Sequence, residues 1–235
     1  MAENYCIKEG YVALTERRTF DGDTDGSYWN ADRLALSRRY QYYVYALARR
    51  LIRSEGRKSL MDVGCGPALK IRELLAPHCG DFVLVDQPTI EGIVKQNVDC
   101  PFVAADLDTI EIDLGRTFDV VVCADVVEHL LDPARCLAFI RRHLGERSVA
   151  LISTPERYHL YGKRCMRSMH PDHVREWNAD EFGRYLASQG FRVRRTLLYP
   201  QMRIGAAEFG LSRLLSPLVR TRAWSSCQVA VCQKR

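Results

Sequence analysis

Short apolar runs recur through the middle of the chain, and segments with helical spacing separate most of them. The apolar runs predict strands at 59–63, 82–86, 101–105, 119–124, 148–153 and 191–198. The segments between them predict helices at 68–77, 89–96, 134–144 and 179–189. Continuous apolar runs are typical of strands that are covered on both faces. The alternation therefore predicts an α/β fold with a mostly parallel, doubly wound sheet.

Each end of the chain departs from this alternation. Residues 31–54 carry apolar side chains at helical spacing, which predicts one continuous helix. Four tyrosines crowd this helix, and we expect one or two of them to reach a ligand: Tyr40, Tyr42, Tyr43 and Tyr45. Near the other end, an apolar run at 228–232 follows no regular crossover helix. It predicts a late antiparallel strand.

Length and composition indicate a single globular domain. A chain of 235 residues, 47% hydrophobic and 27% charged, suffices for one sizeable core with elaborations. No apolar run approaches the ~20 residues that span a bilayer. The N-terminus lacks the basic start and apolar core of a signal peptide. We therefore expect a cytoplasmic protein with no membrane partner.

The nine cysteines do not form a metal or disulfide pattern. There is no Cys-x-x-Cys pair, and several cysteines fall inside predicted strands. We interpret them as reduced thiols that are mostly buried, as expected in the cytosol.

A glycine turn and a set of acidic residues mark one edge of the predicted sheet. The first strand ends in Gly64-Cys65-Gly66, where the missing side chains allow a ligand to approach the backbone. Asp86 and Asp106 end the next two strands, and Asp125 ends the fourth. Because the carboxyl ends of parallel strands share one edge, these residues predict a nucleoside-binding edge.

This arrangement resembles the class I S-adenosylmethionine-dependent methyltransferases, in particular the small-molecule, ubiquinone-type O- and N-methyltransferases. The resemblance covers residues 55–200 and the last strand. It rests on Asp62-Val63-Gly64-Cys65-Gly66, Asp86, Asp106, Glu128-His129-Leu130 and His173-Val174-Arg175-Glu176-Trp177-Asn178. It implies a seven-stranded sheet of order 3-2-1-4-5-7-6, with an antiparallel last strand, and S-adenosylmethionine as cofactor.

The resemblance also implies roles for residues around the first strand. Asp86 would accept hydrogen bonds from both ribose hydroxyls, as an ionised carboxylate can. Gly64, Cys65 and Gly66 would bring the backbone against the methionine and ribose portions. Asp62 would lie under the amino group or hold the turn.

Further cofactor-binding candidates follow the other strands. By the same resemblance, Asp106 and the amide of Leu107 would bind the adenine edge, with Gln87 or Pro88 against its face. Ala124 and Asp125 would line the sulfonium side.

The chain departs from related patterns at two neighbouring positions. The methyltransferases often have glycine at the position of Ala68, but alanine is tolerated there and Pro67 suits a first helical position. A dinucleotide-binding dehydrogenase would need glycine at Leu69. The leucine argues against hydride transfer.

Histidines supply the candidates for acceptor chemistry. A hydroxyl acceptor benefits from a general base, and histidine suits this role at neutral pH. We expect His170 or His173 to be the base, with His129 as the next candidate; the alternative is that His173 docks the insertion. His170 and His173 have no clear third ligand beside them in the sequence, so we expect no metal.

These observations predict a methyltransferase with a variable acceptor side. Residues 1–54 would form a lid, 55–235 the cofactor-binding domain, and insertions 155–178 and 199–226 the acceptor site. We expect residues 1–30 to give the core little apolar surface, so that their deletion would damage turnover more than folding. The insertions carry more basic than acidic residues, which favours an anionic or phosphorylated acceptor.

The predicted reaction is O-methylation of a small molecule: a sugar, nucleotide-sugar or natural-product hydroxyl. Two alternatives stay open, an RNA- or protein-modifying methyltransferase and a non-catalytic, cofactor-binding regulatory subunit. Nucleic acid is not an expected partner, because no RNA-binding appendage is visible. The oligomeric state stays open, with a homodimer among the options.

Overall fold

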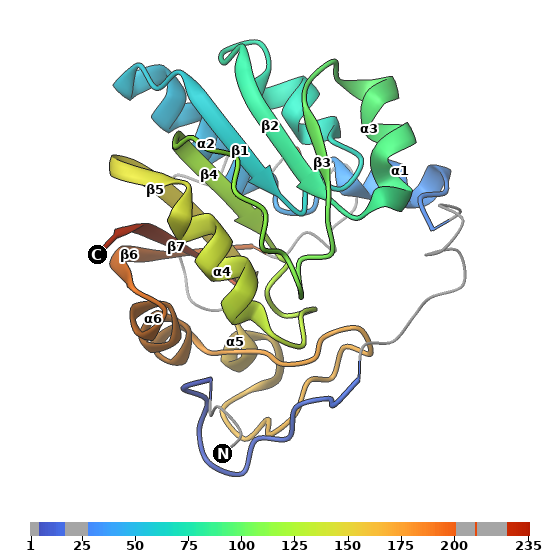
Figure 1. Cartoon of the computed structure of the whole chain (residues 1–235). Helices are drawn as coiled ribbons and strands as arrows, with labels where there is room; N and C mark the ends of the chain where they lie inside the picture. Colours follow the sequence, from blue (N-terminus) through green and yellow to red (C-terminus); the bar gives the residue numbers. More distant parts are fainter. Residues whose placement is uncertain (1–4, 17–27, 201–209, 211–224) are drawn as a thin grey trace.

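A seven-stranded sheet forms the centre of the molecule (Figure 1). The computed structural model describes residues 5–16, 28–200, 210 and 225–235. The strand order is β3-β2-β1-β4-β5-β7-β6. This confirms the expected order. The strands are β1 (Ser59–Val63), β2 (Asp81–Asp86), β3 (Phe102–Ala104), β4 (Phe118–Ala124), β5 (Leu144–Pro155), β6 (Phe191–Tyr199) and β7 (Cys227–Lys234).

The direction of the strands places the carboxyl ends of β1 to β5 at one edge. These five strands pair in parallel. Strand β7 runs antiparallel to both of its neighbours, with Ala230 opposite Ile152 of β5 and Thr196 of β6. The prediction of a late antiparallel strand is therefore confirmed.

Helices cover both faces of the sheet. One face packs against α2 (Tyr42–Glu55), the π-helical turn η1 (Ile71–Leu75), the 3-10 turn η2 (Pro88–Ile90) and α3 (Glu91–Asn97). The other face packs against α4 (Pro133–Arg142) and α6 (Ala179–Ser188). Strand β4 alternates between them: Val121 and Cys123 belong to the core on the side of α4 and α6, whereas Val120 and Val122 belong to the core on the side of α2 and α3. The doubly wound arrangement is confirmed.

The single helix predicted over 31–54 is wrong. The structure has two helices, α1 (Ala31–Ser37) and α2, separated by a turn. Gln41 precedes α2 with φ 55°, a left-handed conformation that breaks the helical path. Asn30 caps α1 by accepting a hydrogen bond from the N–H of Arg33 at 3.0 Å. The apolar spacing continues through the break, so the sequence pattern does not show it.

Two smaller elements also differ from the sequence prediction. The helix predicted at 68–77 is shorter, and its centre is the π-helical turn η1. Pro67 lies in the turn before this helix and not at its first position. A short helix, α5 (Arg157–Tyr161), follows β5 and was not expected.

The N-terminal segment packs against the core. Ile7 is 5% exposed and lies among the residues beneath α4 and α6. The indole N–H of Trp177, itself fully buried, donates to the carbonyl of Tyr5 at 2.9 Å. The N–H of Val12 donates to the carbonyl of Met166 at 2.8 Å. The expectation that this segment gives the core little apolar surface is therefore wrong for its described part.

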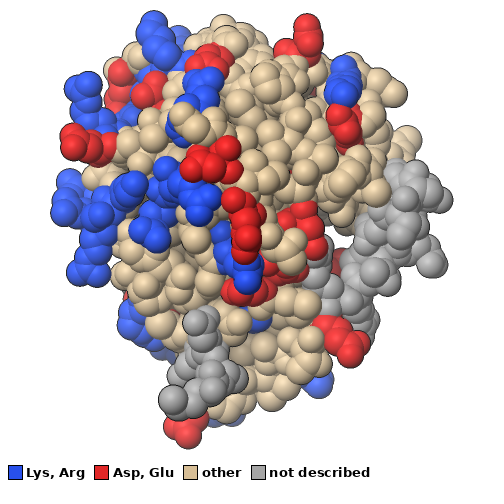
Figure 2. All heavy atoms as spheres, viewed as in Figure 1, with Lys and Arg blue, Asp and Glu red and all other residues tan. Residues whose placement is uncertain are grey.

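Positive charge gathers away from the carboxyl edge of the sheet. Figure 2 shows Lys and Arg side chains collected on the left of the molecule, the side of β5 and β6 in Figure 1. The exposed residues of β6 include Arg192, Arg194 and Arg195. In the same view the carboxyl ends of β1 and β2 point to the lower right.

Within the described part of the chain, no helix has the length and apolar character needed to cross a membrane.

Replacing Ile7 with alanine should lower the free energy of unfolding by about 2–4 kcal/mol, because a buried isoleucine loses its contacts and leaves a cavity. Urea unfolding measures the loss. The control is Val12→Ala: Val12 is 65% exposed, so the change should cost less than about 0.5 kcal/mol. Equal stability of the two variants would show that the segment is detachable.

Candidate functional site

A cavity of about 870 Å³ opens at the carboxyl edge of the sheet. It is bounded by the glycine turn after β1, the ends of β2 and β4, α1, and the segment before α6. Of the catalytic and cofactor-binding candidates from the sequence, Asp62 alone does not line it. Those that do are Gly64, Cys65, Gly66, Asp86, Gln87, Asp106, Leu107, Ala124, Asp125, His129, His170 and His173.

The turn after β1 has left-handed backbone at three positions, two of which are glycines. Gly64 and Gly66 have φ 74° and 56°. A Cβ on Gly64 would lie 2.4 Å from Cγ2 of Val126, so any other residue would require the Val126 side chain or the turn to shift. Ala68, where related enzymes often have glycine, also has φ 56°. An alanine bears this conformation at a cost of roughly 1–2 kcal/mol.

Asp86 fastens the turn to the end of β2. Its two carboxylate oxygens accept hydrogen bonds from the N–H groups of Gly66 and Gln87, each at 2.7 Å. Burial raises the pKa of Asp86, although these two bonds act in the opposite direction. The carboxylate is thus held at the cavity wall beside bare backbone.

A buried polar group lies under this turn. The hydroxyl of Tyr45 donates to Oδ2 of Asp62 at 2.8 Å, and Oδ1 has no hydrogen-bond partner among the residues that the structure describes. Burial raises the pKa of Asp62 to about 7. The ammonium of Lys70 lies 4.9 Å from the centre of the Tyr45 ring and donates to the carbonyl of Ser37 at 2.8 Å. Burial lowers the pKa of Lys70 to about 8. Lys70 thereby links the cavity floor to the end of α1.

The break between α1 and α2 lets α1 form a wall of the cavity. Trp29 and Arg33 line it, and a Cβ on Gly66 would lie 3.4 Å from Cη2 of Trp29. Of the four tyrosines singled out in the sequence, Tyr40 and Tyr45 line the cavity. The sequence indicated a lid over residues 1–54 and offered the tyrosines as candidates, but it did not identify Trp29 or Arg33, because the position of α1 depends on the turn before α2.

The end of β4 turns sharply into the cavity. Asp125 has φ 53°, and its Oδ1 accepts a hydrogen bond from the hydroxyl of Ser153 at 2.6 Å. Burial raises the pKa of Asp125. The side chain is therefore fixed between β4 and β5.

Two loops distant in sequence are hydrogen-bonded to each other beyond Asp125. The carbonyl of Glu128 accepts from the N–H of Val174 at 2.8 Å. The guanidinium of Arg175 donates to the carbonyls of Leu130 and Leu131 at 2.8 and 2.9 Å. Val174 and Arg175 thus dock the insertion on the loop after β4.

These bonds bring three histidines together. The rings of His170 and His173 stack at 4.1 Å, and His129 meets His173 edge-on at 4.8 Å. Nδ1 of His129 lies 2.9 Å from the carbonyl of Asp172, and Nδ1 of His173 lies 2.6 Å from Oε1 of Glu176. Burial, followed by the neighbouring His173, lowers the pKa of His129 to about 3. That pKa makes His129 a weak base at neutral pH.

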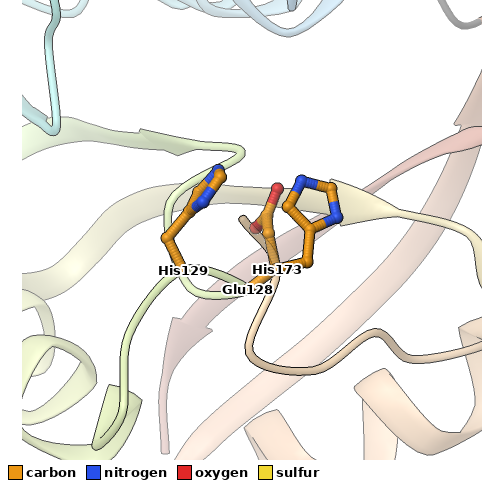
Figure 3. Close-up of side chains that lie close together, drawn as sticks. All are labelled: Glu128, His129 and His173. Carbon is orange, nitrogen blue, oxygen red and sulfur yellow. The ribbon is translucent and has the colours of Figure 1, made fainter. Parts of the chain in front are cut away.

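Glu128 is a site residue that the sequence reasoning did not select. It is 0% exposed, yet it lines the cavity between His129 and His173 (Figure 3). Burial, with Asp125 nearby, raises its pKa well above the usual range for a glutamate. The sequence signal that could have identified Glu128 was its position just after a buried strand, directly following the apolar pair Val126-Val127.

The charged groups that line the cavity are mostly acidic. Among the described residues, the Lys and Arg side chains that line it are Arg33 and Lys70. Arg164 and Arg167, from the basic insertion, are exposed and do not line it. The second predicted insertion, 199–226, falls largely outside the described residues.

The sheet order, the glycine turn and the acid at the end of β2 together define a class I methyltransferase fold. The sequence of residues 35–196 matches the methyltransferase domain family. The chain therefore belongs to this family.

Comparisons with individual proteins agree. A relative from Mycolicibacterium smegmatis, named as a probable S-adenosylmethionine-dependent methyltransferase, is 28% identical over 195 residues, 79% of this chain and 68% of the relative. The ubiquinone biosynthesis O-methyltransferase of Rickettsia akari is 26% identical over 125 residues, 51% of this chain and 49% of that protein. The plantazolicin methyltransferase BamL, solved with S-adenosylhomocysteine, has a TM-score of 0.64 at 14% identity, covering 91% of each chain.

S-adenosylmethionine is the cofactor of this family, and the cavity has features that fit it. The glycine turn offers a cradle that a Cβ would fill, and the carboxylate of Asp86 stands beside it. The acidic lining suits a ligand with a positively charged sulfur and amino group.

Asp62 should make stability depend on pH. Its pKa is higher in the folded protein than the unfolded value of about 4, so the carboxyl group favours folding when protonated, and this contribution is lost as pH rises toward 7. In Asp62→Asn the group cannot ionise. The free energy of unfolding of the variant minus that of the wild type should therefore increase from about pH 4 to 7. Urea unfolding of the ligand-free protein at several pH values measures it.

Asp119→Asn is the control with the opposite sign. Burial alone would raise the pKa of Asp119, but the N–H groups of Lys58 and Ser59 hold it below its usual value. Its contribution to stability is present above the unfolded pKa and is lost as pH falls. The free energy of unfolding of Asp119→Asn minus that of the wild type should therefore decrease as pH rises. A flat profile for Asp62→Asn would contradict the assignment of its pKa.

Proposed function

We propose that the chain transfers a methyl group from S-adenosylmethionine to a hydroxyl group of a small molecule. One observation carries the proposal: a single cavity contains both the glycine turn with Asp86 and the cluster of Glu128 with its histidines. When bound, S-adenosylmethionine supplies an electrophilic methyl group on positively charged sulfur. The chain must bind and align the acceptor.

The residues at the cofactor end have separate tasks. We propose that Asp86 accepts hydrogen bonds from the ribose hydroxyls, since its carboxylate is already oriented by Gly66 and Gln87. Asp106 and the amide of Leu107 would bind adenine. Other residues proposed to contact or support the cofactor are Asp62, Gly64, Cys65, Ala124 and Asp125.

Asp62 supports the cofactor from below. It does not line the cavity, and Tyr45, which does, lies above it and is held by it. An indirect role through Tyr45 therefore fits better than contact with the amino group.

The shape and charge of the acceptor end favour a small molecule that is not anionic. The cavity is walled by α1 on one side and by the segment around His170 on the other. Asp125, Glu128 and Asp172 face the acceptor end, which therefore offers carboxyl groups rather than Lys or Arg side chains to an acceptor. The Rickettsia relative is named as an O-methyltransferase and BamL as a methyltransferase of plantazolicin. Both names support a small-molecule hydroxyl or natural-product acceptor.

Replacing Asp86 with alanine should weaken binding of S-adenosylhomocysteine by about 2–4 kcal/mol, because charge-assisted hydrogen bonds are lost. Asp86→Asn keeps one acceptor oxygen and should lose less. Calorimetry with the purified chain measures both affinities.

The matched control for this binding test is Asp81→Ala. Asp81 is exposed at the other end of β2 and pairs with Arg116. Its removal should leave the affinity unchanged. Equal affinities for wild type and Asp86→Ala would remove Asp86 from the cofactor site.

Incubation of the chain with labelled S-adenosylmethionine and a metabolite extract should label a small molecule, and mass spectrometry should locate the new methyl group on oxygen. Label found solely in RNA or protein would instead support a macromolecule-modifying enzyme. Cofactor binding without any labelled product would support a regulatory subunit.

A further inference from the structure

We propose that Glu128, His129 and His173 form a binding site for a divalent first-row transition-metal ion at the acceptor end of the cavity. Each residue offers one ligand atom, and these atoms lie within 4.8 Å of one another. Figure 3 shows the three side chains converging from the loop after β4 and from the segment before α6. Ligand atoms around such an ion lie roughly 3–3.5 Å apart, given bonds of about 2.0–2.2 Å, so small side-chain rotations close the site.

The surroundings of the two histidines orient them as metal ligands. Nδ1 of His173 is held by the carboxylate of Glu176, and Nδ1 of His129 by the backbone carbonyl of Asp172. These partners fix each ring and make Nε2 the nitrogen that would bind an ion. A histidine whose second nitrogen donates to a carboxylate or a carbonyl is the usual arrangement around protein-bound metals.

The carboxylate of Glu128 supports the metal site independently of the two histidines. It is fully buried, and neither carboxylate oxygen has a hydrogen-bond partner among the described residues. The nearby Thr154 hydroxyl favours the ionised form, but it forms no hydrogen bond of normal geometry. A buried carboxylate without partners is costly, and coordination of a cation would remove that cost.

The ligand set selects the kind of ion. Two imidazoles and one carboxylate suit Mn²⁺, Fe²⁺, Co²⁺, Ni²⁺ or Zn²⁺ better than Mg²⁺ or Ca²⁺, which prefer oxygen ligands throughout. Three protein ligands also leave coordination positions open, as in catalytic rather than structural sites. All three residues line the cavity, so the open positions face the space for the acceptor.

A metal ion here would have a catalytic role in the proposed methyl transfer, and this part of the inference rests on that proposed function. An ion at this site would bind an oxygen atom of the acceptor, fix its position and lower the pKa of its hydroxyl group. The three histidines singled out in the sequence then have a different role from the expected one: His129 and His173 are ligands, and His170 stacks on His173. The acceptor class is a compound with a hydroxyl group able to coordinate a metal.

The test uses the untagged chain, stripped of metal by a chelator, because a histidine tag would itself bind the ions. Titration with Co²⁺ is followed by calorimetry and by visible absorption, which reports nitrogen and oxygen ligation directly. We expect one ion per chain, a rise in Tm, and weaker binding of Mg²⁺ than of Co²⁺.

Variants locate the ion. Glu128→Gln, which keeps the shape of the side chain, and His173→Ala should each weaken Co²⁺ binding by at least about 100-fold, whereas Glu176→Gln should weaken it by about 10–100-fold through loss of orientation. The control is His78→Ala, an exposed histidine after η1, which should bind Co²⁺ like the wild type. If His173→Ala does not fold, Glu128→Gln carries the test.

Affinity for S-adenosylhomocysteine, measured without metal, separates this inference from the proposed function. It should stay unchanged in Glu128→Gln, so a failure of metal binding is not a failure of cofactor binding. A wild type that binds none of these transition-metal ions would overturn the proposal and would return His173, oriented by Glu176, to the role of general base. Unchanged Co²⁺ affinity in Glu128→Gln would also overturn it.

Discussion

The hydrogen bonds between the loop after β4 and the segment before α6 are the constraint on which the site depends. The carbonyl of Glu128 accepts a hydrogen bond from the N–H of Val174, and the guanidinium of Arg175 donates to the carbonyls of Leu130 and Leu131. These bonds fix the insertion directly against the loop after β4, over the sheet edge. With them, His129 and His173 meet at 4.8 Å, with Glu128 between them. Packing of the N-terminal segment on Trp177 supports the same segment from behind.

A concentration of acidic groups is the second feature of the site. Asp86, Asp125 and Glu128 all line one cavity, and burial raises the pKa of each. Such a lining is unfavourable for the empty protein, and positively charged ligands relieve it. The sulfonium cofactor brings positive charge to one end, and the proposed ion brings it to the other. The two proposals therefore have a common electrostatic origin.

Local patterns predicted the fold because the strands are continuous apolar runs that end in glycine or acid. The sheet order followed from the resemblance carried by residues 62–66, Asp86 and the Glu128-His129-Leu130 turn. The pattern could not show contacts between distant segments or the backbone conformation of single residues. The left-handed Gln41 divides a segment whose apolar spacing is unbroken. Glu128 directly precedes His129 in the sequence, but its approach to His173 became visible when the fold brought the two loops together.

The central claim is that one cavity holds the cofactor at Asp86 and presents its reactive end to the cluster of Glu128, His129 and His173. A crystal structure with S-adenosylhomocysteine tests it most directly. We expect the ribose hydroxyls at hydrogen-bond distance from Asp86 and the sulfur atom directed toward Glu128. A ligand bound outside this cavity, or one whose sulfur points away from the cluster, would contradict it.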